Sequence, residues 1–213
     1  MSPRTADPAV RPALIEAAAR LLAEGGPAAL STRRLATEVG TSTMRIYTHF
    51  GSMTDLHAAV RREGFDRLAG ALRAQADTGD PVTDLAAAAL TYLRAALAAP
   101  ELYRAMFNHR PPPGDDAGTD IFALLTDRVS RCLEAGRFPD ADPARAAVWA
   151  GELWTALHGA VTLALSGILP AEQPGLLLAD MIFRLAVGFG DSRVAARRSI
   201  EDAQAAFGKA DRP

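Results

Sequence analysis

The stretch Val39-Gly40-Thr41-Ser42-Thr43-Met44-Arg45-Ile46-Tyr47-Thr48-His49-Phe50 decides how this chain is interpreted. Ile46 and Phe50 are four residues apart, so on a helix they share one face and can pack inward. Thr43 and Arg45 then face outward near the start of the same helix. The pattern predicts a short helix over residues 43–50, entered through a tight turn that contains a glycine.

Two further helices are predicted upstream of this one. Apolar residues recur at helical spacing from Val10 to Leu22, and Gly25-Gly26-Pro27 then predicts a helix end. A second, short helix is expected from Ser31 to Val39. Two short helices joined by a tight turn form a helix-turn-helix, in which the last helix enters the major groove of DNA and the preceding helix crosses the backbone.

The side chains on these two helices suit contacts with DNA. The planar donor fork of Arg45 fits O6 and N7 of guanine, and Thr43 and Met44 can touch base edges or a thymine methyl. Hydroxyl and imidazole groups are suited to phosphates, as is the helix start at Ser31. The predicted DNA-contacting residues are Ser31, Thr32, Arg33, Ser42, Thr43, Met44, Arg45, Tyr47, Thr48 and His49.

The rest of the chain also predicts helices, because alanine and leucine dominate it and alternating strand patterns are missing. Ser52 and Asp55 have the spacing of a capping box at the start of a long helix. The expected helices cover residues 52–76, 83–98, 100–108, 119–136, 142–166 and 172–189. An all-α protein follows, with domains at 1–55 and 56–190 and a polar tail at 191–213, for which a loose helix and disorder both remain open.

Composition limits the classes of protein that fit. The chain has 213 residues, 49% hydrophobic and 23% charged, as in an ordinary globular protein. Residues 1–62 carry eight arginines and five acids, whereas the remainder carries 15 basic and 20 acidic residues. This asymmetry favours a nucleic-acid partner, although it also arises by chance. One cysteine, Cys132, excludes an intrachain disulfide, and with no membrane span or signal peptide apparent we expect a cytoplasmic protein.

Residues 10–62 resemble the DNA-binding domain of TetR/AcrR-type transcriptional regulators. The most specific match is the box Ile46-Tyr47-x-His49-Phe50 after Gly40-x-Ser42, and Leu14, Ala17-Ala18, Leu21-Leu22 and Leu35-Ala36 fit the same pattern. The resemblance implies an all-α homodimer with a C-terminal ligand-binding and dimerisation domain. It further implies a repressor that a small-molecule effector releases from a palindromic operator in double-stranded DNA.

One position departs from that family pattern. Family members usually carry a lysine directly after the residue that matches Ser52, where it contacts a phosphate, but this chain has Met53. Arg4, Arg11, Arg61 and Arg62 are candidates to compensate. The loss of one phosphate contact is expected to weaken binding and to lower the salt slope by about one unit.

The second domain resembles a C-terminal domain marked by tryptophan, histidine and glycine, here Trp149, Trp154, His158 and Gly159. Residues that can line an effector pocket are Tyr103, Met106, Phe107, Phe122, Trp154 and His158. Each of them also has an ordinary interpretation, because aromatic and methionine clusters are often core and a histidine on a helix often bonds a backbone carbonyl.

The family pattern places the dimer interface on the helices at 142–166 and 172–189. The apolar faces expected there are Ala156, Gly159, Ala160 and Leu163 on one helix and Met181, Leu185 and Phe189 on the other. Cys132 is interpreted as a small buried hydrophobe rather than a redox sensor, and Asp115-Asp116 as solvated surface rather than a metal site.

An enzyme is not expected, because no nucleophile elbow, phosphate-binding loop or zinc helix motif is present. No metal site or cofactor is expected either. The alternative kept open is a helical interaction or ligand-binding protein that has lost DNA binding, which Met53 alone favours.

Overall fold

The computed structural model describes residues 9–107, 111, 114–139, 142–170 and 173–210, and every regular element within them is an α-helix. Contacts divide the chain into two compact units. The first unit holds the described residues up to Arg67 together with Ala99–Gly118, and the second holds Leu68–Ala98 and the residues from Thr119 onward. The all-α class predicted from the sequence is confirmed, whereas the division at residue 55 into functional domains stays a prediction.

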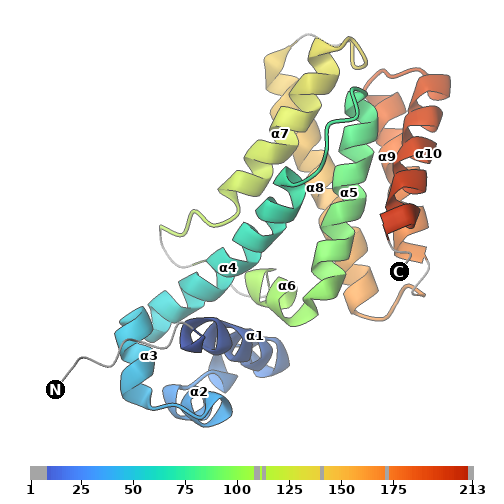
Figure 1. Cartoon of the computed structure of the whole chain (residues 1–213). Coiled ribbons are helices and arrows are strands. Elements are labelled where there is room, and N and C mark those ends of the chain that lie inside the picture. The colour runs from blue at the N-terminus through green and yellow to red at the C-terminus, as the bar shows by residue number, and fades with distance from the viewer. Residues whose placement is uncertain (1–8, 108–110, 112–113, 140–141, 171–172, 211–213) are drawn as a thin grey trace. The chain divides into compact units, whose positions relative to one another are not determined.

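The first unit contains α1 (Val10–Ala29), α2 (Thr32–Val39), α3 (Thr43–Phe50), α6 (Pro100–Phe107) and the larger part of α4 (Met53–Arg73). In Figure 1 these are the blue helices, the cyan part of α4 and the short green helix α6. Large apolar side chains from α1 to α4 meet in one core, which α6 joins by packing on α1. The fully buried members of this core include Leu14, Leu35, Ile46, Leu56 and Val60.

Glycines bound the elements of the first unit where the sequence predicts breaks. Gly26, with φ 67° and ψ −163°, interrupts the helical conformation of α1 just before Pro27. Gly40 ends α2 in the left-handed conformation, at φ 67° and ψ 35°, which costs a glycine little. Gly64 has a different role, because a Cβ atom there would clash with the side chain of Met106, so its absence lets α4 and α6 approach closely.

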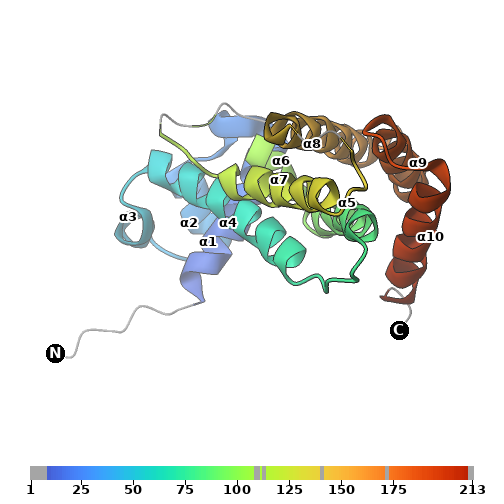
Figure 2. The same cartoon turned by 90° about the horizontal axis from the view of Figure 1, so that it is seen from above.

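The second unit is a bundle of α5 (Pro81–Ala98), α7 (Thr119–Glu134), α8 (Pro143–Leu165), α9 (Gln173–Gly188) and α10 (Arg193–Ala210), joined by the end of α4. Helix α5 is buried on most sides, because α7, α8, α9 and α10 all contact it. Figures 1 and 2 show α10, in red, lying beside α9 at the edge of this bundle.

Helix α10 settles the alternatives left open for the residues after Gly190. Ala196, Ile200 and Ala203 are buried on its inner side. Its start is held by Arg137, whose Nη2 donates to the Asp191 carboxylate at 2.6 Å and to Ser199 Oγ at 3.1 Å. Most of the stretch that the sequence describes as a polar tail is therefore a docked helix.

Candidate nucleic-acid interface

Helix α3 presents one buried and one exposed side, as the sequence predicts. Ile46 is 1% exposed and Phe50 is also buried, and both belong to the core of the first unit. Met44 is 73% exposed and Tyr47 48% exposed on the other side. The predicted contact residues Thr43, Met44, Arg45, Tyr47 and Thr48 are all exposed, and His49 is half-buried beside Phe50.

Serine side chains start both short helices. Ser42 Oγ accepts a hydrogen bond from the backbone N–H of Arg45 at 3.3 Å, and Ser31 Oγ accepts one from the N–H of Arg34 at 3.2 Å. Such caps stabilise a helix by about 1 kcal/mol each. Each hydroxyl keeps its own O–H donor, so a serine that caps its helix can also donate to a phosphate oxygen. The sequence analysis predicted only the phosphate contact for these serines and not the helix cap.

The arginines of the first unit fall into two groups. Arg20 pairs with Glu38 at 3.2 Å, and Arg34 pairs with Glu24 at 3.0 Å. Within the described residues, the guanidinium groups of Arg33 and Arg45 have no hydrogen-bonding or ionic partner. These two exposed cations on α2 and α3 are therefore available to an anionic partner without breaking an existing ion pair.

Arg61 does not fill the role suggested for it as a substitute for a phosphate-binding lysine, whereas for Arg62 that role stays a prediction. Arg61 is buried, and its Nε donates to the carboxylate of Asp115 at 2.7 Å while Nη1 donates to the carbonyl oxygen of Met106. Arg62 is exposed and pairs with Asp116 at 2.6 Å. Both side chains are held by the segment that follows α6, which the sequence does not place beside α4. The prediction of a solvated Asp115 is likewise wrong, because its side chain is only 3% exposed.

Of the other two suggested substitutes, Arg4 lies outside the described residues and Arg11 stacks its guanidinium over the Phe50 ring at 5.3 Å. Met53 itself is half-buried and packs against the core of the first unit. The start of α4 is capped as predicted, since Ser52 Oγ accepts from the Asp55 N–H at 3.1 Å and donates to its carboxylate at 2.6 Å. Met53 therefore has a packing role where the family pattern has a charge.

The six residues predicted to line an effector pocket fall into two groups, one in each unit. Tyr103 and Met106 are buried in the first unit, where Phe107 contacts Tyr103 with 4.9 Å between ring centroids. Phe122, Trp154 and His158 belong to the second unit.

In the second group, Trp154 Nε1 donates to the Tyr92 hydroxyl at 3.2 Å, and Phe122 lies 6.1 Å from Trp154 between ring centroids. His158 Nε2 lies 3.5 Å from Thr162 Oγ1, and partial burial lowers the pKa of its imidazole. A neutral imidazole suits an apolar site better than a charged one does. The role of all six residues in effector binding stays a prediction.

Helices α8 and α9 carry an exposed apolar groove of about 750 Å³, whose lining includes Val148, Ala156, Met181 and Leu185. Val148 is 54% exposed. Two residues assigned to this face from the sequence do not belong to it. Ala160 and Phe189 are buried, and Phe189 stacks on Trp149 with 4.5 Å between ring centroids.

Other features of the described residues limit the chemistry. No group of three or more histidine, cysteine or acidic side chains within them can hold a metal ion. Burial raises the pKa of the Cys132 thiol to about 12, which keeps it protonated and unreactive at neutral pH. Within the described part of the chain no single helix is long and apolar enough to cross a bilayer, and only the bent pair α5 and α6 passes a test of length and composition.

Comparisons with known proteins agree with this geometry. A family model described as bacterial regulatory proteins of the tetR family matches residues 14–60, and one described as a tetracyclin repressor-like C-terminal domain matches residues 85–187. Neither description names the tryptophan–histidine–glycine subgroup, which stays a prediction. An uncharacterized HTH-type transcriptional regulator of Mycobacterium tuberculosis is 31% identical over 184 residues, which are 84% of this chain and 80% of that one.

Solved structures share the fold. A protein of unknown function from Rhodococcus sp. RHA1 matches with a TM-score of 0.71 at 28% identity, covering 88% of this chain and 98% of that one. RolR in complex with resorcinol matches with a TM-score of 0.59 at 20% identity, covering 90% and 93% of the two chains. With both family models and a relative above 30% identity in agreement, this chain belongs to the TetR family of transcriptional regulators.

Proposed function

We propose that two copies of this chain bind a palindromic operator and that each places α3 in a major groove. The observation that carries this proposal is the outer side of α3. There Arg45, whose guanidinium has no partner among the described residues, stands beside the exposed Thr43 and Met44. Arginine binds guanine O6 and N7 with two parallel hydrogen bonds, and Met44 offers an apolar contact to a thymine methyl. Direct base recognition then rests on three neighbouring residues.

The remaining predicted contacts position the protein on the DNA backbone. Ser31 and Ser42 donate their hydroxyl protons to phosphates while they cap their helices, and Thr32 lies in the first turn of α2. Arg33 supplies charge, and Tyr47, Thr48 and His49 supply donors along α3. These contacts add affinity that depends on salt but not on sequence.

The groove between α8 and α9 supports the proposed dimer. Its occupant in this proposal is the same groove region of a second copy, because apolar side chains such as Val148 and Leu185 lose contact with water when two such faces meet. Glu152 and Arg184 also line the groove, so two copies related by a twofold axis can exchange ion pairs at its edge.

A small molecule bound in the C-terminal domain is proposed to release the operator. RolR is a relative in fold whose solved complex contains resorcinol. For release, the effector must bind the free form of this protein more tightly than the operator-bound form, because equal affinity for both shifts nothing. Such a repressor acts in the bacterial cytoplasm, where the chromosome lies, and it needs no catalytic activity.

The test is a footprint and a gel shift on the DNA that flanks the protein's own gene. We expect a protected, roughly palindromic site with two half-sites about one helical turn apart or a multiple of it. Binding should fall steeply with salt and should exceed binding to random DNA. Equal affinity for the flanking DNA and for random DNA would contradict the proposal.

The second candidate is a helical ligand-binding or interaction protein without an operator, which Met53 favours because it removes one phosphate contact. The same experiment separates the two candidates. Protection of a specific site would exclude the protein without an operator. If no site in the whole flanking region is protected even at low salt, that second candidate is favoured.

A further inference from the structure

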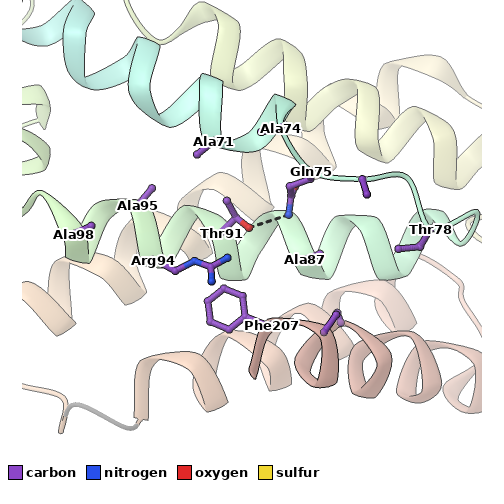
Figure 3. A pocket seen from close by; sticks show the side chains of 13 residues that line it. Ala71, Ala74, Gln75, Thr78, Ala87, Thr91, Arg94, Ala95, Ala98 and Phe207 are labelled. Carbon is purple, nitrogen blue, oxygen red and sulfur yellow. Dashed lines mark hydrogen bonds between the residues drawn. The ribbon is translucent and has the colours of Figure 1, made fainter. Parts of the chain in front are cut away.

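Two exposed apolar features differ in what they offer chemically, a groove in the second unit and the Met44 side chain in the first. The groove, of about 560 Å³, lies between the end of α4, helix α5 and helix α10 (Figure 3). Its polar side chains are engaged, since Gln75 donates to Thr91 Oγ1 at 2.9 Å and Arg94 lies over the Phe207 ring at 4.1 Å from its centroid. Among its described lining residues nothing selects a ligand, whereas Met44 presents a reactive sulfur atom.

Met44 is the most exposed methionine in the described part of the chain. It is 73% exposed, whereas Met106 is 2% exposed and Met53 and Met181 are half-buried. The sulfur of Cys132 is not a competing target, because this cysteine is buried. Susceptibility of sulfur to oxidation follows its exposure, so an oxidant dissolved in water reaches Met44 first among these side chains.

The Met44 side chain lies where a change in its chemistry alters recognition and leaves the fold intact. Helix α3 is anchored through Ile46 and Phe50, which are buried in the core of the first unit. Met44 contributes only its carbonyl oxygen, which accepts a hydrogen bond from Thr48 Oγ1 at 2.9 Å. Its thioether extends into solvent beside Arg45, on the side of α3 that the proposed function places against base edges.

We propose that Met44 is an oxidation site, and that its conversion to methionine sulfoxide by hydrogen peroxide weakens operator binding; this inference rests on the proposed function. The sulfur lone pair forms a bond to one peroxide oxygen and the O–O bond breaks. The proton of the bound oxygen passes to the departing hydroxide, which leaves as water. Sulfur is oxidised and peroxide is reduced, and methionine sulfoxide reductases reverse the change.

The sulfoxide weakens binding because it is polar where the thioether is apolar. In the proposed complex Met44 contacts a thymine methyl group. Thymine presents only that methyl group and the acceptor O4 in the major groove, so the sulfoxide oxygen finds no donor on this base. Burial of a polar group without a partner costs free energy, and we expect operator affinity to fall about tenfold.

The first test treats the purified full-length protein with hydrogen peroxide and follows each methionine by mass spectrometry. Trypsin cleaves after Arg45, so Met44 and Met53 fall in different peptides. We expect Met44 to be oxidised at least about tenfold faster than Met106. Bound operator DNA should slow oxidation of Met44, because the groove then covers its sulfur, and should leave the rate at Met106 unchanged.

The second test compares operator affinity before and after peroxide by gel shift. The original chain should lose affinity about tenfold, and a methionine sulfoxide reductase should restore it. Met44→Leu keeps an apolar side chain without sulfur, so peroxide should not change its affinity from its own starting value. Met53→Leu is the matched control, because it removes a different sulfur from the first unit and should stay sensitive to peroxide. Thermal unfolding before and after treatment shows whether each protein is folded.

The outcomes separate this inference from the proposed function on which it rests. Oxidation of Met44 no faster than that of Met106, unchanged operator affinity after Met44 is oxidised, or an equal loss of affinity in Met44→Leu would each overturn the inference alone. Untreated protein that binds no operator would overturn the proposed function and the effect of oxidation together.

Discussion

Arg45 and Arg61 belong to the same unit and carry the same charge, but they differ in exposure and in the partners of their guanidinium groups. Arg45 is exposed on α3 and has no side-chain partner among the described residues. Arg61 is buried on α4, donates to Asp115 and to the backbone of Met106, and lies 5.6 Å from the centroid of the Phe65 ring. One arginine is available to a partner, and the other holds the fold together.

The basic N-terminal third is therefore not a uniform DNA-binding surface. Several of its arginines are engaged with carboxylates inside the same unit, which reduces the charge available to phosphates. The net charge of a region measures long-range attraction, whereas binding at a defined site depends on which cations are unpaired and exposed.

Removal of the buried arginine should damage stability most. Arg61→Met leaves the carboxylate of Asp115 buried without its cation, which typically costs about 3–5 kcal/mol in the free energy of unfolding. Urea denaturation measures the loss. The double variant Arg61→Met with Asp115→Asn should recover part of it, because no unpaired charge remains. A cost below about 1 kcal/mol would show that the pair is not a structural contact.

Removal of the exposed arginine should affect binding and not folding. Arg45→Ala is expected to weaken operator binding by about 1–3 kcal/mol and to relax preference at one base pair. The midpoint of urea unfolding should stay where it is. Arg20→Ala is the matched control, because Arg20 is also exposed in the first unit but pairs with Glu38. Equal losses of affinity in both variants would mean that only overall charge matters.

A cation introduced at residue 53 should add to the exposed positive charge that Arg33 and Arg45 offer to DNA. Met53→Lys places an ammonium group beside the start of α4, and the lysine stem can cover the same apolar surface as methionine. We expect tighter binding at low salt and a plot of log affinity against log salt that is steeper by about one unit. An unchanged slope would show that residue 53 does not reach a phosphate in this protein.

The sequence predicts the helices and turns of the first unit well where the signal is local. The helices from Val10 to Phe50, the break at Gly25-Gly26 and the buried pair Ile46 and Phe50 all follow from spacing and from turn residues. Local signals of this kind act within one or two turns of helix, so a single sequence contains them.

The sequence fails where the outcome depends on segments that are distant along the chain. The pairing of Arg61 with Asp115 joins residues 54 positions apart, and no sequence pattern near either residue indicates it. Ala160 and Phe189 fit an interface pattern by spacing, yet neighbours such as Trp149 bury Phe189 within the chain. The cap formed by Ser42 is a local signal that the prediction overlooked, because serine before a helix is a common N-cap.

The smallest effect is expected at Arg62, which is next to Arg61 in sequence but lies at the surface. The hydrogen bond and charge of Arg62 lower the pKa of the Asp116 carboxyl below its ordinary value. A carboxyl whose pKa is lowered by folding contributes stability above its unfolded pKa and loses it as the pH falls through the folded pKa. Because both side chains are exposed, that contribution is small and is screened by salt.

Arg62→Gln should therefore leave the unfolding midpoint at pH 7 unchanged within error while raising the pKa of Asp116 toward its ordinary value. NMR titration of the aspartate carboxyl carbons measures the shift directly. A clear loss of stability in Arg62→Gln would place Arg62 with Arg61 as a structural residue. In that case pairing with a carboxylate, and not burial, would decide which arginines stabilise the fold.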